Sequence, residues 1–336
     1  MRRLVVCALL VVSAAAYQAV AEEAELKFRV QRLTERVAVF TEVSPWESNH
    51  VVIVGADGMV LVDPGHSGLM ARLIRRAVAE ELGRHRFDYV IDTHGHWGHT
   101  WGNSGFPEAM AVGHEQAAAT IEAARSRLEP QLAAIRGQLE HAEAAAGDHD
   151  PESDEAREAA LQRAHLERLV RGLGEPGFEI QPPGLTFSDR MTLDLGDATL
   201  EMVFLGPGHS PSDIAIFIPE EKVLLVGCFF FEQGPLPVFG MQPELDPDRW
   251  FEVLDGFLAD EAAIEHVVLG QHSVWPRSRL VAVRDYMAAL WAGVRELEAE
   301  GVDFESAVER LPGPEGLDWV REAGAGGEDL AGYHRY

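Results

Sequence analysis

The sequence predicts an α+β fold in one large domain with helical additions. Short apolar runs bounded by glycine, proline or aspartate recur along the chain and are typical of buried strands. Apolar residues at helical spacing occupy other stretches, at roughly 115–180, 277–300 and 303–311. With 336 residues, of which 46% are hydrophobic, the chain is long enough to enclose a sizeable core.

Residues 1–21 have the features of a secretory signal peptide. They begin with two arginines, continue with an apolar run too short to cross a bilayer, and end in Ala19-Val20-Ala21 before an acidic residue. We therefore expect an exported protein, periplasmic or extracellular, with no stable membrane anchor. After cleavage Cys228 is the one remaining cysteine, so an intramolecular disulfide is excluded. Binding a metal would protect this thiol from oxidation.

The first predicted strands form a hairpin. The segment Ser48–Asp63 contains two apolar runs joined by Ala56-Asp57-Gly58, which is a typical hairpin turn. A third apolar run, Phe87–Asp92, also has the composition of a buried strand.

Three imidazoles follow this third run within six positions, at His94, His96 and His99. Alternate residues leaving a strand point to opposite faces, but once the chain turns they can converge on one ion. Imidazole is a standard ligand for zinc and related metals. A histidine-rich surface loop is the alternative, but a cluster of three favours a metal site.

Later strands also end in side chains that can bind metal. The run beginning at Met202 leads through a glycine turn to His209. The run beginning at Lys222 ends at Cys228, and the run beginning at Ile264 leads to His272. Each of these residues alone has an ordinary structural explanation, as a cap, a loop residue or a buried apolar filler.

The stretch from His94 to His99 resembles the His-x-His-x-Asp-His motif of the metallo-β-lactamase superfamily, and the later side chains follow in that family's order. The resemblance implies an αββα sandwich over residues 22–276, with a helical insertion at about 115–180 and a helical extension at 277–336. It also implies that His94, His96 and His209 hold one metal ion.

The second metal site departs from the family pattern, because Gly98 stands where the family has an aspartate. By resemblance the remaining second-site ligands are His99, Cys228 and His272. A thiolate and two imidazoles make a three-ligand zinc set with a fourth position for water. The alternatives are two ions, or one ion at the three-histidine site. We expect zinc, one or two ions, with iron possible.

Further residues are predicted around these ligands. Asp63, in an element resembling the family's Val-Asp-x-Gly, is expected to order the metal loops. Asp213 is expected to orient a ligand or to cap a turn, and His114 to support the site or simply to end a strand. Trp97 and Trp101 flank the histidine loop, where they either line a substrate pocket or support the loop.

The insertion is predicted to form two helices that serve as a lid or pocket wall, or as a dimerisation arm. The first helix should be kinked at Pro130. Three histidines of this region, His141, His149 and His165, are expected to be solvated. A glycine-rich tail begins at Gly313.

The formal net charge of −27 argues against a nucleic-acid partner and favours a small-molecule substrate. No Gly-x-Ser-x-Gly elbow is present. The resemblance therefore implies an exported zinc-dependent hydrolase in which a metal-bound hydroxide attacks an ester, thioester, lactone or β-lactam. The alternatives are a mononuclear iron enzyme that oxidises sulfur compounds, and a metal-binding or scaffold protein with impaired catalysis.

Overall fold

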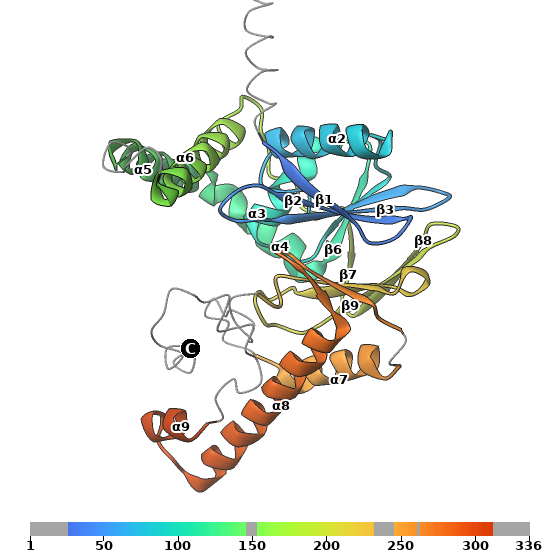
Figure 1. The fold of residues 1–336 in the computed structure, drawn as a ribbon, viewed down its shortest axis with the longest axis vertical. Helices are drawn as coiled ribbons and strands as arrows, with labels where there is room; N and C mark the ends of the chain where they lie inside the picture. The colour runs from blue at the N-terminus through green and yellow to red at the C-terminus, as the bar shows by residue number, and fades with distance from the viewer. Residues whose placement is uncertain (1–25, 146–152, 232–244, 261–262, 312–336) are drawn as a thin grey trace, which may run out of the picture.

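The computed structural model describes residues 26–145, 153–231, 245–260 and 263–311. Two sheets lie face to face, with helices on their outer sides (Figure 1). The predicted α+β sandwich is therefore confirmed. The expected signal peptide, the tail from Gly313 and His149 lie outside the described residues.

The first sheet follows chain order, with antiparallel pairing from β1 to β4 and parallel pairing from β4 to β7. Its strands are β1 (Phe28–Arg32), β2 (Val37–Glu42), β3 (Asn49–Val54), β4 (Met59–Val62), β5 (Tyr89–Asp92), β6 (Met110–His114) and β7 (Leu185–Phe187).

The second sheet has the order β13-β12-β11-β10-β9-β8, antiparallel except for the parallel pair β11 and β12. Its strands are β8 (Arg190–Asp194), β9 (Thr199–Phe204), β10 (Ile214–Ile218), β11 (Val223–Gly227), β12 (His266–Leu269) and β13 (Val274–Pro276).

Strands β2 to β4 of the first sheet are buried on both faces, whereas the edge strand β1 is largely exposed. Successive side chains of a strand point to opposite sides. In β2, Val37 and Val39 belong to the core between the sheets, whereas Ala38 and Phe40 face the outer helix layer. Burial on both faces explains why β2 to β4 are rich in apolar residues at successive positions.

Helices cover both outer faces (Figure 1). On the first sheet lies α2 (Gly68–Leu82), which begins where the Ser67 side chain accepts a hydrogen bond from the Met70 amide and ends at Gly83. On the second sheet lie α7 (Pro247–Leu258) and α8 (Arg277–Glu300), and α9 (Phe304–Arg310) follows. No helix in these described ranges is long and apolar enough to cross a bilayer.

The insertion folds as helices, with two differences from the prediction. Instead of one helix kinked at Pro130, α4 (Glu115–Ala124) ends before a 3-10 turn and α5 (Leu128–Ala145) begins there. Proline lies in the first turn of α5, where its missing N–H costs nothing.

The second difference concerns α6 (Asp154–Leu173), which packs against α5. His141 on α5 is exposed as expected, but His165 on α6 is only 1% exposed. His165 lies four residues before Leu169 and therefore on the same, inward face of the helix.

The loop after β5 packs backbone against backbone on the loop after β4. Its short helices are α3 (Trp97–Thr100) and a 3-10 helix (Trp101–Gly105). The Gly102 amide donates to the Gly65 carbonyl at 2.8 Å, and a Cβ at Gly102 would lie 2.2 Å from the Pro64 carbonyl oxygen. Only glycine allows this approach.

We expect Gly102→Ala to lower the free energy of unfolding by about 1–3 kcal/mol or more, because the backbone must move to relieve the clash. Gly137→Ala in α5 is the matched control: its Cβ meets no atom within 4 Å, and we expect about 0.5–1 kcal/mol of stabilisation. Urea unfolding of both variants measures this. Equal stability of the two variants would contradict the close packing.

Candidate metal centre

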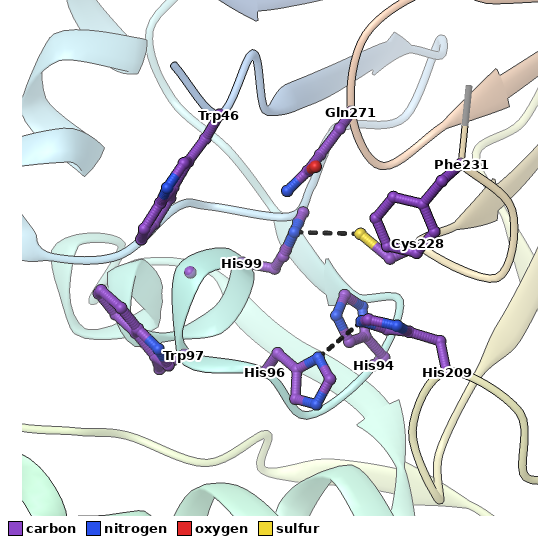
Figure 2. A pocket seen from close by; sticks show the side chains of 10 residues that line it. Trp46, His94, His96, Trp97, His99, His209, Cys228, Phe231 and Gln271 are labelled. Carbon is purple, nitrogen blue, oxygen red and sulfur yellow. Dashed lines mark hydrogen bonds between the residues drawn. The ribbon is translucent and has the colours of Figure 1, made fainter. Parts of the chain in front are cut away.

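Strand ends from both sheets bring the candidate ligands together around one pocket (Figure 2). His94 lies two residues beyond β5, and α3 carries His99. From the second sheet, the loop after β9 carries His209 and the end of β11 is followed by Cys228.

His94, His96 and His209 form the first group, with donor atoms within 4.8 Å of one another. His96 Nδ1 and His209 Nε2 lie 2.8 Å apart. The hydroxyl of Thr93 lies 3.0 Å from His94 Nδ1, and His94 Nε2 is buried with no hydrogen-bond partner among the described residues. A buried nitrogen without a partner, next to two further imidazoles, is what a metal ion would satisfy.

The electrostatics of this group suit metal binding. Burial lowers the pKa of His94 well below its usual value, and burial lowers that of His96 to about 4. Both rings are therefore neutral at pH 7, which is the form that binds a metal ion.

His94 also belongs to a second group, with His99 and Cys228. The Cys228 sulfur lies 3.2 Å from His99 Nε2. Burial raises the pKa of the Cys228 thiol, so a thiolate here needs a positive charge beside it. A metal ion or a protonated His99 would supply that charge.

Glycine at position 227 lets Cys228 approach the loop after β5. Gly227 has a φ of 55°, and a Cβ there would lie 2.6 Å from the Thr93 hydroxyl. The second sheet can therefore meet Thr93 closely enough to place Cys228 beside His99.

Asp63 holds the histidine loop, as the resemblance implied. Its carboxylate accepts hydrogen bonds from the Thr93 amide at 2.9 Å and from the Thr93 hydroxyl at 2.8 Å. The same carboxylate lies 3.1 Å from His99 Nδ1. This contact fixes the His99 ring so that Nε2 points towards Cys228.

Trp46 covers the position where a side chain at Gly98 would lie. A Cβ at Gly98 would come within 3.3 Å of the Trp46 ring. The backbone of Gly98 lies in α3 and has no positive φ, so backbone strain is no obstacle to a side chain there. A side chain at this position would therefore need the Trp46 indole to move by a few tenths of an ångström.

His272 is not brought into either ligand group, contrary to the expectation of a His99–Cys228–His272 set. It has a φ of 61°, and its Nδ1 lies 2.9 Å from the Glu47 carboxylate. Its neighbour Gln271 lines the pocket instead.

His114 does not support the metal ligands. Its Nδ1 accepts from the Gln116 amide at the start of α4, so its Nε2 donates to the Ser188 carbonyl at 2.9 Å. Its ring stacks on Phe204, with centroids 4.0 Å apart. It is a helix cap that joins the two sheets.

Asp213 caps the turn that follows His209. Its carboxylate accepts hydrogen bonds from the Ser210 amide at 2.9 Å and the Ser210 hydroxyl at 2.6 Å, next to His209. Burial raises the pKa of Asp213 to about 7. Its effect on the site is therefore to shape the loop that carries His209.

The ligand groups open into a cavity of about 540 Å³ (Figure 2). Trp97 lines it as predicted, but Trp101 does not: it is 2% exposed and belongs to the core of the insertion. Sequence reasoning missed three lining residues, Trp46, Phe231 and Gln271. All three lie within a few residues of strand ends, which is the signal that could have found them.

Comparison with known proteins identifies the family. Residues 43–265 match the metallo-beta-lactamase superfamily. The chain belongs to this superfamily, as the motif resemblance implied.

Individual relatives are distant. A metallo-beta-lactamase type 2 of Bacteroides fragilis is 28% identical over 96 residues, which is 29% of this chain and 37% of that protein. The stereoselective inverting sec-alkylsulfatase Pisa1 of Pseudomonas sp. is similar in structure, with TM-score 0.62 and 17% identity over 87% of this chain and 47% of that chain.

A metallo-beta-lactamase from Pontibacter korlensis has TM-score 0.52 and 16% identity over 78% of this chain and 99% of that chain. The matched parts cover less than half of the Bacteroides and Pseudomonas proteins. At these identities the structural similarity establishes the fold of this chain and does not identify its substrate.

The Gly98 position can be tested with a pair of variants. We expect Gly98→Asp alone to lower the free energy of unfolding by about 1–3 kcal/mol without adding metal, because the new side chain crowds the indole of Trp46. The double variant Gly98→Asp with Trp46→Ala should bind more metal than Trp46→Ala alone. Metal analysis and thermal unfolding measure both. A stable single variant with more metal would show that Trp46 is no obstacle.

Proposed function

We propose that this protein is an exported zinc-dependent hydrolase of small, uncharged esters, thioesters or lactones. The observation that carries the proposal is the three-histidine group beside a pocket, in which His94 Nε2 is buried with no hydrogen-bond partner in the described part of the chain. Membership of the superfamily and the hydrolases among the relatives support the reaction class.

The ligands for the first ion would be His94, His96 and His209. Bound zinc would lower the pKa of a coordinated water from about 15.7 towards 7 and polarise a carbonyl group of the substrate. The chain's own residues hold the geometry: Asp63 and Asp213 fix the two ligand loops.

The pocket walls support an uncharged, apolar substrate. Trp46, Trp97 and Phe231 supply aromatic surface, and Gln271 supplies a neutral amide. No lysine or arginine is among the described residues that line the pocket. Among these residues a sulfate ester or a β-lactam carboxylate would meet no cationic side chain, which supports neutral esters, thioesters and lactones as substrates.

A mononuclear iron enzyme is the second candidate. Two observations favour a single ion: Gly98 offers no carboxylate, and His272 pairs with Glu47 rather than joining the second group. Three imidazoles leave open positions, as oxygen-using iron sites require. Metal analysis of protein purified without added zinc distinguishes the two candidates, since iron near one equivalent would favour the oxidase.

Removing two ligands tests the hydrolase directly. We expect His96→Ala with His209→Ala to lose the first ion and to hydrolyse phenyl acetate about 100-fold more slowly or worse, about 2.7 kcal/mol of barrier. His141→Ala, on the exposed surface of α5, is the control and should keep both metal and rate. An unchanged rate in the double variant would exclude this group as the reaction centre.

Export rests on the order of charged, apolar and small residues in 1–21. Intact-mass analysis of protein from the extracytoplasmic fraction of its host should give a chain that begins at Glu22. An uncleaved chain beginning at Met1 in that fraction would contradict the proposal.

A further inference from the structure

The helical insertion and the pocket wall share one hydrophobic cluster. The core of this cluster combines Trp101 from the loop after α3 with apolar residues of the three insertion helices. Trp46 and Trp97, which line the pocket, pack against the same cluster. The insertion is therefore part of the structure that holds the pocket wall, rather than an independent arm.

The side chain of Trp46 contacts both the helical insertion and the pocket. One side of its ring faces the pocket beside Gly98, and it contacts Trp97 edge-to-face with centroids 5.2 Å apart (Figure 2). It also contacts the ring of His165 from α6, with centroids 4.4 Å apart and planes at 62°. Trp46 lies in the loop between β2 and β3, so no helix or strand of its own fixes its orientation.

His165 acts here as a flat, uncharged ring. Burial lowers its pKa to about 4, so it is neutral at pH 7. Within the described ranges, neither of its ring nitrogens has a hydrogen-bond partner. Its neighbours are the ring of His66, with centroids 6.3 Å apart, and the buried carboxylate of Glu42. Of its two ring contacts among the described residues, the one with Trp46 is the shorter.

We propose that His165 is a positioning residue: its ring holds the indole of Trp46 as the pocket wall over the metal loop. The insertion thereby sets the width of the pocket and favours substrates with a flat apolar group beside the bond that is cleaved. This substrate preference rests on the proposed hydrolase function, whereas the positioning of Trp46 does not.

Two other roles for His165 are distinguished by substitution. If only the shape of the ring matters, phenylalanine can replace histidine, because it keeps a flat face against the indole. If the ring nitrogens instead bind an ion or water together with Glu42 and His66, phenylalanine fails as alanine does. If α6 is merely structural, Trp46 keeps its place in every folded variant.

Circular dichroism gives a readout that needs no turnover. The Trp46–Trp97 pair should produce an exciton couplet in the far-ultraviolet spectrum. Its amplitude is obtained by subtracting the spectrum of the same protein with Trp46→Phe, which retains the Trp97–Trp101 pair. We expect this amplitude to fall by more than half when His165→Ala is introduced into both proteins, and to persist with His165→Phe. The exposed His141→Ala should leave it unchanged. A full couplet in His165→Ala, or its loss in a folded His165→Phe, would overturn the positioning role.

Kinetics test the substrate preference. In His165→Ala we expect the KM for phenyl acetate to rise about three- to tenfold at nearly unchanged kcat, with ethyl acetate unaffected and metal content equal. His165→Phe should restore the wild-type KM. Equal effects on both esters, or metal loss in His165→Phe, would overturn the proposal. A wild-type protein that hydrolyses no ester would contradict the hydrolase proposal. The circular dichroism measurement would still test whether His165 positions Trp46.

Discussion

The carboxylate of Asp63 joins the end of β4 to the loop that carries the histidines, and the site depends on this contact. Asp63 is 2% exposed and has a φ of 57°, a conformation that aspartate tolerates better than most residues. Its hydrogen bonds to Thr93 fix where the chain turns after β5, and its contact with His99 fixes that ring. Because the acceptor is a carboxylate, these bonds are stronger than neutral ones.

From this anchor the remaining geometry follows through close backbone contacts. Gly102 brings the histidine loop against the loop after β4, and Gly227 brings the second sheet against Thr93. The two sheets therefore meet at the edge where the ligand side chains lie, while their apolar faces form a common core. The ligands thus lie on turns and short segments that follow the strand ends, and other loops and the insertion form the pocket around them.

The fold could be predicted from the sequence, and the resemblance to the superfamily motif predicted that His94, His96, His99, His209 and Cys228 come together after buried strands. The second group was predicted only in part, because His94 joins His99 and Cys228 where His272 was expected. Features that depend on distant packing could not be predicted. The orientation of His272 follows from its own positive φ and from its contact with Glu47. Trp46 contacts Gly98 from a loop that lies about fifty residues earlier in the chain. The burial of His165 did have a local signal, since its spacing from Leu169 places it on the apolar face of α6.

We expect three imidazoles from the two sheets to hold one ion beside the pocket. Crystal diffraction recorded on both sides of the zinc absorption edge can locate this ion. In protein purified with zinc, an anomalous peak is expected at about 2.0–2.1 Å from His94 Nε2, His96 Nδ1 and His209 Nε2. An ion bound elsewhere, or no peak at these nitrogens in crystals grown with zinc, would contradict it.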